Sequence, residues 1–316
     1  MNARLPLATA VTALMLAARP AQAADAPPTD PIIGGVQTEE GRFDAVVALR
    51  NSRGALCTGT LITTRIVMTA AHCLDEQREG SPVRVFFGPD TDGLSMESVS
   101  FGIHPDYCEF CDTEVFDFAY IELPEPYLPV DGVLPPITDQ FEWNEAMRPT
   151  RKVFLVGYGT NNPSTSSGLR DEVKRDVSTT IARFSENALE FFAGGGQRDT
   201  CNGDSGGPAV VQLGSGQYRL GGVTSRGLKP CGQGGWYGVP YTVLTWLRDE
   251  TGADLLPPDC PFGDCLDLLP PGEQEGCSVA SPGPTAPAVP LLLVLLAARR
   301  RRRLTGFGPA GPASPR

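Results

Sequence analysis

The chain has 316 residues and a formal net charge of −11, and 41% of its residues are hydrophobic. All 37 acidic residues lie between Asp25 and Glu275, whereas eight of the 26 basic residues lie outside this region. The region therefore contains 18 basic and 37 acidic residues, which gives it a net charge of −19. This charge argues against a nucleic-acid partner, because phosphate binding depends on clustered Lys and Arg, and it favours solubility and cationic substrates.

The N-terminus has the pattern of a secretory signal peptide. Arg4 precedes an apolar stretch from Leu5 to Ala18, and Ala21-Gln22-Ala23 offers a small-residue cleavage site. The apolar stretch is too short to span a bilayer as a resident helix. We therefore expect residues 1–23 to be a signal peptide on an exported protein, with residues 24–31 following as a short propeptide. Export also suits the nine cysteines of the chain.

Short β-rich runs broken by turns begin near residue 45. In chain order the predicted strands are 45–50, 59–64, 83–87, 116–123, 153–158, 208–213 and 219–223. A helical pattern appears only at Val243–Glu250, and no internal repeat is evident. About 220 residues are enough to bury a substantial core. We therefore expect an all-β domain over residues 32–250 that ends in one helix.

Two motifs that lie far apart carry the reactive residues. Thr69-Ala70-Ala71-His72-Cys73 contains one of only two histidines, and residues 201–208 read Cys-Asn-Gly-Asp-Ser-Gly-Gly-Pro around Ser205. A serine needs a base to take its proton before it becomes an effective nucleophile, and His72 is a suitable base. The glycines around Ser205 let a substrate backbone approach and let backbone N–H groups point at a carbonyl oxygen.

Asp117 is the best candidate for a carboxylate that orients the His72 ring. It interrupts the apolar run 116–123, and a buried carboxylate is costly unless it has a partner. Asp112, in a loop-like stretch, is the alternative. The chain order His72, Asp117, Ser205 is the order of the chymotrypsin-type triad.

These motifs together resemble the trypsin/chymotrypsin family of serine proteases, from about Ile32 to Glu250. The resemblance implies two six-stranded antiparallel Greek-key barrels with a C-terminal helix and a domain join near residues 148–152. It implies peptide-bond hydrolysis through an acyl-enzyme, with protein or peptide substrates and no cofactor. A protease fold that has lost its activity and only binds a partner is the alternative function.

The resemblance also assigns roles to single residues. His72 would move the Ser205 proton while Asp117 holds the imidazole, and the N–H groups of Gly203 and Ser205 would bind the oxyanion. Glycine suits position 203 because a Cβ there would obstruct the turn. The second histidine, His104, lies in a His-Pro-Asp-Tyr segment similar to a structural segment of the family, so we expect it to be structural.

Substrate preference is implied by the residues expected around the primary pocket. Asp199, six positions before Ser205, corresponds to the pocket floor, while Gly227 and Gly238 correspond to its walls. Ser225 corresponds to the serine that lines the cleft and binds the triad carboxylate. A buried carboxylate below a narrow slot favours Arg or Lys. The chain departs from the family at residues 239–241, Val-Pro-Tyr, where Val-Tyr-Thr is usual.

The resemblance implies a zymogen that is activated by cleavage. Ile32-Ile33-Gly34-Gly35 is similar to the N-terminus that such zymogens expose, and its ammonium would pair with Asp204. The residue before the cut is Pro31, and residues 24–31 contain no Arg or Lys. We therefore expect a separate activating protease rather than self-activation.

Eight of the nine cysteines can be assigned to pairs. The family resemblance implies two pairs, one beside the catalytic histidine and one at the pocket, while the other two pairs are expected as short local bridges. No metal site is expected. The four pairs are Cys57–Cys73, Cys201–Cys231, Cys108–Cys111 and Cys260–Cys265.

The composition changes after the predicted helix. Residues 251–290 are rich in Pro, Gly and acidic residues, which is typical of a solvated linker. Within residues 291–316, the apolar run Leu291–Ala298 precedes the arginine block Arg299–Arg303, consistent with the positive-inside rule. With the remaining Cys277, this tail resembles the C-terminal sorting signals of myxobacterial surface proteins, which implies attachment to a bacterial cell surface. A disordered tail with a chance apolar stretch is the alternative.

Overall fold

The computed structural model describes residues 32–111, 115–159 and 172–269. Several expectations lie outside these residues: the signal peptide 1–23, the propeptide 24–31, the tail 291–316, Asp112 and Cys277. Among the helices that the described ranges contain, none is long and apolar enough to cross a membrane.

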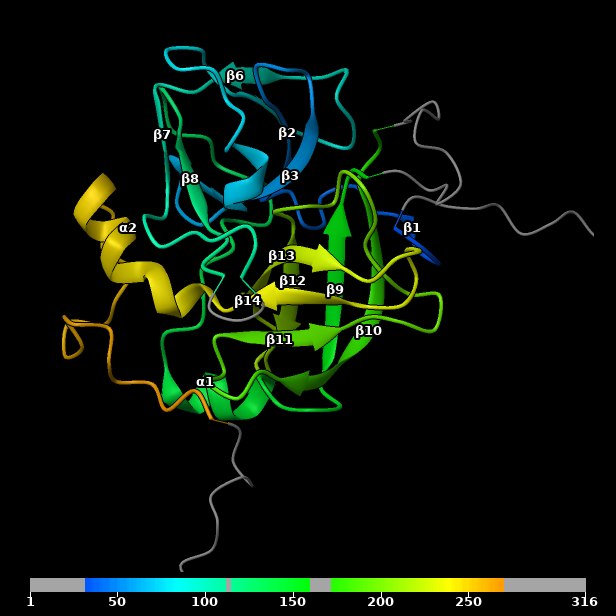
Figure 1. Cartoon of the computed structure of the whole chain (residues 1–316), viewed down its shortest axis with the longest axis vertical. Helices are drawn as coiled ribbons and strands as arrows, with labels where there is room; N and C mark the ends of the chain where they lie inside the picture. The colour runs from blue at the N-terminus through cyan, green and yellow to red at the C-terminus, as the bar shows by residue number, and fades with distance from the viewer. Residues whose placement is uncertain (1–31, 112–114, 160–171, 270–316) are drawn as a thin grey trace, which may run out of the picture. The chain divides into compact units, whose positions relative to one another are not determined.

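The first antiparallel barrel lies in the upper half of Figure 1. Its strands follow the order β6-β5-β2-β3-β4-β8-β7. β6 and β7, at the two ends of this order, are separated only by Ser98 and Val99, whose N–H groups donate to the carbonyls of Val83 and Glu122. They therefore form two arms of one bent strand, which brings the ends of the sheet together. The bounds are β2 Val46–Arg50, β3 Leu56–Leu61, β4 Ile66–Thr69, β5 Arg84–Phe86, β6 Ser95–Glu97, β7 Ser100–Ile103 and β8 Ala119–Glu122.

The second antiparallel barrel lies below the first and is closed by hydrogen bonds (Figure 1). Its strands follow the order β10-β11-β14-β13-β12-β9, and β9 also pairs with β10. The short strand β1 adds to the β10 edge. The bounds are β1 Val36–Gln37, β9 Lys152–Gly157, β10 Arg175–Phe184, β11 Glu190–Ala193, β12 Pro208–Gln212, β13 Tyr218–Gly227 and β14 Gly235–Gly238. The expected all-β, two-barrel fold is confirmed.

The core is continuous between the barrels. Buried side chains of both barrels belong to one contiguous cluster, which includes the fully buried Ile121, Tyr158 and Tyr237. Fully burying a large apolar side chain contributes about 1.5–3 kcal/mol. The two barrels therefore pack as one unit, and residues from each can be held in fixed positions at their junction.

In the described residues, two α-helices and two short 3₁₀ helices accompany the barrels. Asp139 caps α1 (Gln140–Ala146) by accepting the N–H of Glu142 at 3.0 Å. The 3₁₀ helix η2 (Pro240–Val243) leads into α2 (Leu244–Thr251), which ends at Gly252 with a left-handed φ of 73°. The other 3₁₀ helix, η1 (Ala71–Cys73), carries His72. The predicted C-terminal helix thus corresponds to α2.

Of the predicted linker 251–290, the structure describes residues 251–269, most of which are exposed or partly exposed. Leu256 and Cys260 are buried, and Leu256 belongs to the core cluster of the two barrels. The Tyr241 hydroxyl accepts the N–H of Cys265 at 3.1 Å. A hydrogen bond, a disulfide and a few apolar side chains therefore anchor this segment to the domain, while most of its residues stay in contact with solvent.

All seven predicted runs overlap a strand, but several elements were missed. β10 was missed because its outward positions carry Thr and Arg, so only scattered residues are apolar. β14, Gly-Trp-Tyr-Gly, contains two glycines, which are depleted in strands. Pairing with neighbours on both sides, not local propensity, makes these segments strands. The other missed elements are β1, β4, β6, β7, β11 and α1.

Candidate active site

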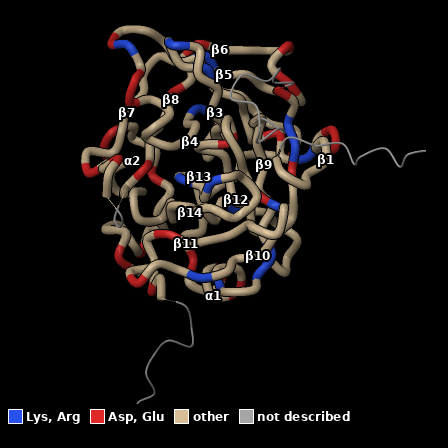
Figure 2. Tube along the Cα trace, turned by 45° about the vertical axis from the view of Figure 1, so that its right-hand side comes forward, with Lys and Arg blue, Asp and Glu red and all other residues tan. Residues whose placement is uncertain are grey.

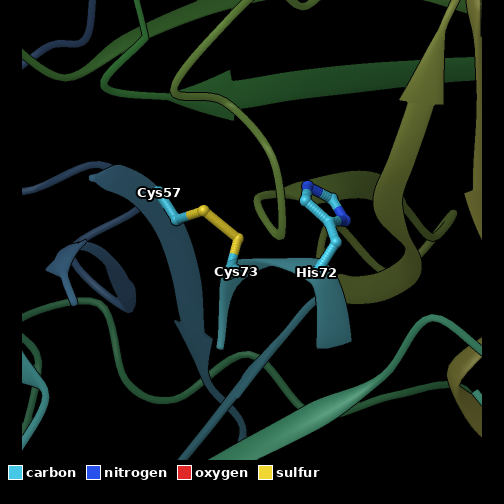
Figure 3. Close-up of side chains that lie close together, drawn as sticks. All are labelled: Cys57, His72 and Cys73. Carbon is cyan, nitrogen blue, oxygen red and sulfur yellow. A yellow bond between two sulfur atoms is a disulfide. The ribbon is translucent and has the colours of Figure 1, made fainter. Parts of the chain in front are cut away.

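His72 is held at the junction by a short helix and a disulfide. It lies in η1, directly after β4, and the Cys57–Cys73 disulfide ties this helix to β3. Figure 3 shows the disulfide and the imidazole leaving the helix in different directions. The two sulfurs and one ring nitrogen lie within 4.8 Å of one another, but the S–S bond leaves no thiolate to coordinate an ion. We therefore infer that the disulfide supports the position of His72 and that the three residues do not bind a metal ion.

Asp117 meets both the backbone and the ring of His72. Its carboxylate accepts the His72 N–H at 3.0 Å and contacts Nδ1 at 2.8 Å. The Ser225 hydroxyl donates to the same carboxylate at 2.7 Å. The structure thus brings together three residues that the sequence analysis selected, from η1, the segment before β8, and β13.

The charges of this cluster stabilise one another. Burial alone acts to lower the pKa of His72, but the hydrogen bond and charge of Asp117, with the charges of Asp75 and Glu109, leave it raised above 6.5. Burial acts to raise the pKa of Asp117, but its bonds with His72 and Ser225 leave it lowered. The carboxylate therefore stays ionised and favours a proton on the imidazole.

Ser205 lies in a tight turn between barrels. Gly203 has a φ of 100°, and a Cβ there would come within 2.8 Å of the Gly159 Cα, so only glycine fits. Within the described residues, the N–H groups of Gly203 and Ser205 have no protein acceptor. The described residues likewise contain no hydrogen bond between the His72 ring and the Ser205 hydroxyl, a contact that often tightens only when substrate binds.

Thr58 is a site residue that the sequence analysis missed. From β3 of the first barrel, its hydroxyl donates to the Gly203 carbonyl at 2.9 Å and its N–H donates to the Ser205 carbonyl at 2.8 Å. It also accepts the N–H of Tyr158. Thr58, a residue of the first barrel, thereby holds in place the turn that carries Ser205 and leads into the second barrel. Its place beside Cys57 was the only signal, since nothing local marks a threonine as a long-range anchor.

Asp204 is a buried carboxylate without a charge partner in the described structure. It is completely buried and accepts the N–H groups of Gly159 and Cys201 at 2.8 and 2.9 Å. Burial raises its pKa to about 7. Among the described residues no Lys, Arg or His forms an ion pair with it. Ile32, its expected partner after cleavage, is fully buried, and the Ile33 carbonyl accepts the N–H of Asp199 at 3.1 Å.

Asp199 is also deeply buried, and its partners among the described residues are all backbone N–H groups. Its carboxylate accepts the N–H groups of Thr200, Gly232 and Gly234 at 2.9, 3.0 and 2.7 Å. Burial raises its pKa, which these bonds partly offset. In the described part of the chain it has no cationic partner. A buried carboxylate in this state can bind a cation brought by another molecule.

The two glycines expected at the pocket walls lie on neighbouring strands. Gly227, at the end of β13, pairs with Gly235 of β14. Gly238 lies opposite Val223, and a Cβ there would meet the Phe118 ring at 2.7 Å. Both glycines therefore belong to the β13–β14 pair of the second barrel.

Arg226 is a second residue that the sequence analysis missed. It directly follows Ser225 and forms a bidentate ion pair with Glu190 of β11. Its guanidinium also lies 5.6 Å from the Trp236 ring centroid. The side chain is one-third exposed, so it presents a polar surface beside the site. Its position next to Ser225 in the sequence was the available signal.

The four expected cysteine pairs are all disulfides in the structure, including Cys108–Cys111 and Cys260–Cys265. Cys201–Cys231 links the turn before Ser205 to the loop that binds the Asp199 carboxylate. Figure 2 shows acidic residues along the side that carries β7 and α2. The surface charge is thus consistent with the negative balance of the sequence.

Comparison with known proteins identifies the family. The sequence profile of the Trypsin family matches residues 32–247, and the chain belongs to this family of serine proteases. It is 29% identical over 246 residues to "Transmembrane protease serine 9" of Rattus norvegicus. The aligned region covers 69% of this chain but only 21% of that relative.

Two invertebrate proteins are similar over more of their length. The identity is 27% to "Phenoloxidase-activating factor 1" of Holotrichia diomphalia, covering 72% of this chain and 71% of the relative. It is 28% to "Proclotting enzyme" of Tachypleus tridentatus, covering 70% and 65%. The chain therefore spans between about one fifth and seven tenths of the length of these relatives.

Proposed function

We propose that this chain is an active serine endopeptidase that works through an acyl-enzyme on Ser205. The observation that carries the proposal is the pair of hydrogen bonds from His72 to the buried carboxylate of Asp117, at 3.0 and 2.8 Å. Membership of the trypsin family supports it. A carboxylate on Nδ1 fixes the tautomer whose other ring nitrogen can accept a proton.

Each residue has one task in the proposed reaction. His72 takes the Ser205 proton as the serine oxygen attacks the scissile carbonyl, and then gives this proton to the leaving amine. The N–H groups of Gly203 and Ser205, which lack acceptors among the described residues, bind the oxyanion. One such donor is worth about 10²–10³ in rate. A water molecule activated by His72 then hydrolyses the acyl-enzyme.

The first test separates an active enzyme from an idle binding module. Protein that begins at Ile32 should be labelled covalently by an organophosphonate probe and should hydrolyse peptides. Ser205→Ala should abolish labelling and reduce hydrolysis by about 10⁴-fold or more, and His72→Ala should lose a comparable amount because the triad acts as a unit. Ser215→Ala, on an exposed turn, is the matched control. No labelling of folded wild-type protein would support the binding module.

Cleavage after Arg or Lys is the proposed specificity. Asp199 supports it, because this buried carboxylate has only backbone donors within the described structure. A substrate guanidinium or ammonium would supply the missing cation. The charges of Asp75 and Glu109 near His72 also favour a cationic substrate.

A fluorogenic peptide panel tests this specificity. Asp199→Ser should lower kcat/KM for Arg and Lys peptides by about 10³-fold, since an unpaired buried charge costs roughly 3–5 kcal/mol. Asp249→Ser, which removes an exposed carboxylate, should change little. Wild-type preference for aromatic or small side chains would contradict the role given to Asp199.

Activation by cleavage before Ile32 is part of the proposal. A freed ammonium at Ile32 would give the buried Asp204 a charge partner, which none of the described residues provides. Because Pro31 precedes the cut and residues 24–31 lack Arg and Lys, a separate protease should perform the cleavage. N-terminal sequencing of active protein should begin at Ile32, and full activity of protein beginning at Ala24 would contradict this scheme.

Export and surface attachment complete the proposal. The signal-peptide pattern of residues 1–23 and the four disulfides of the domain support export. The sequence of residues 291–316 supports attachment. Truncation before Cys277 should release the protein into the medium, and Cys277→Ala should impair its processing. Equal secretion of both forms, with the arginine block still present by mass spectrometry, would favour a disordered tail.

A further inference from the structure

Asp117 lies in a tight turn that begins with a strained residue. Phe116 has a φ of 44°, in the left-handed region that a bulky side chain rarely adopts. The Phe118 N–H donates to the Phe116 carbonyl at 2.8 Å, so Asp117 is the central residue of a three-residue turn. A conformation of this kind persists only where neighbouring groups enforce it. The position of the Asp117 carboxylate therefore depends on what holds Phe116.

His104 holds this turn from two directions. Its ring stacks on the Phe116 ring, with centroids 5.1 Å apart and an interplanar angle of 12°. Its backbone N–H donates to the Phe118 carbonyl at 2.9 Å. The residues before and after Asp117 are thus both in contact with His104, one through the side chain and one through the backbone.

The His104 ring is itself fixed on its other sides. Trp246 of α2 packs edge-on against it, with centroids 4.9 Å apart. His104 Nδ1 accepts the N–H of Asp106 at 3.2 Å, which requires that this nitrogen carry no proton. The side chain is 7% exposed. A stack of Trp246, His104 and Phe116 therefore connects the C-terminal helix to the turn that carries Asp117.

We propose that His104 is a positioning residue of the active site, which clasps residues 116–118 so that the Asp117 carboxylate stays against His72. It acts through Phe116 and Asp117 and touches no reacting atom. Its consequence for catalysis rests on the proposed function, but its effect on the Asp117–His72 contact does not. The flat ring, rather than the imidazole chemistry, is the property that the stack uses.

The chain has only two histidines, which makes a direct measurement possible. In His104→Ala and His104→Phe proteins, the single imidazole observed by NMR belongs to His72. Both are prepared as Ser205→Ala proteins that begin at Ile32, which prevents self-digestion. Asp117 raises the pKa of His72 together with Asp75 and Glu109. Because the variants leave all three acids in place, a change in this pKa reports how Asp117 is positioned.

The His72 pKa should fall in His104→Ala and return to the wild-type value in His104→Phe, where a flat ring can again stack on Phe116. Leu247→Ala, which truncates a fully buried residue next to Trp246, is the matched control for lost stability. It should lower the melting temperature without moving the His72 pKa. An unchanged pKa in folded His104→Ala protein, or an equal shift in Leu247→Ala, overturns the proposal. Where His104→Ala does not fold, Phe116→Ala removes the other ring of the stack and must give the same fall.

Kinetics on the Ser205 form provide the second readout. His104→Ala should lower kcat by about 10- to 100-fold with little change in KM, the loss expected for a displacement of about 1 Å in a catalytic group. His104→Phe should recover most of it. Wild-type protein that cleaves no peptide would reject the proposed function, while the NMR comparison would still decide whether His104 positions Asp117.

Discussion

The buried carboxylate of Asp204 gives a sharp test of activation by cleavage. In the full chain burial raises its pKa to about 7, whereas an aspartate in the unfolded chain titrates near 4. The folded state therefore keeps its proton to a higher pH than the unfolded state. In protein that retains residues 24–31, the contribution of Asp204 to stability should be fully present below about pH 4 and should be lost as the pH rises through 7.

The magnitude follows from the size of the shift. Each pKa unit corresponds to 1.36 kcal/mol, so a shift from 3.8 to about 7 amounts to roughly 4 kcal/mol of unfolding free energy at neutral pH. A free ammonium at Ile32 favours the ionised carboxylate and should remove most of this loss. It should do so up to about pH 8, where an unperturbed α-amino group releases its proton.

Urea unfolding at a series of pH values measures the difference. Two Ser205→Ala proteins are compared, one that begins at Ala24 and one that begins at Ile32. Between pH 4 and 7 only the longer protein should lose stability, and Asp204→Asn in both should abolish the difference between them. Identical pH profiles for the two lengths would refute the pairing of Ile32 with Asp204.

Three further predictions concern residues of the scaffold. Thr58→Val removes the donor to the Gly203 carbonyl and should cost about 1–3 kcal/mol of stability while lowering kcat; Thr58→Ser should retain both, measured by urea unfolding and peptide kinetics. Burial lowers the pKa of Lys174 to about 8, below its value in the unfolded chain, so wild-type stability should rise between pH 8 and 10.5 by up to about 3 kcal/mol, a rise that Lys174→Met should lack in unfolding curves. Replacing both Cys260 and Cys265 by Ser should cost about 2 kcal/mol without changing kcat/KM, which calorimetry and kinetics can check.

Several features of the site could be predicted from the sequence because they depend on short motifs. The segments around His72 and Ser205 must fit a reacting group closely, so their residues are tightly constrained and recognisable. The disulfide pairs were also predictable, two from the family pattern and two from short spacings. The strands with continuous apolar runs, such as β2 and β9, were found for a similar reason, because short apolar runs bounded by turn signals are typical of buried strands.

Other features could not be assigned without the tertiary structure. β10 and β14 were not predicted as strands, because pairing with neighbouring strands on both sides, rather than local propensity, makes them strands. The segment 252–269 was expected to be solvated, and most of it is exposed, but it is also anchored to Tyr241 and by its own disulfide. The pairing of strands and the packing of a segment on the domain depend on residues that are distant in the sequence. Local sequence patterns therefore cannot predict them.

The sequence by itself determined which chemical groups the candidate active site contains: a serine, two histidines, buried aspartates and the cysteines of the disulfides. Only the tertiary structure decided how these groups are held. It selected Thr58 to anchor the Ser205 turn across the barrel junction and His104 to contact the turn around Asp117. The reason is physical, since a side chain's chemistry is local, whereas its position is set by packing and hydrogen bonds between segments that the chain brings together only when it folds.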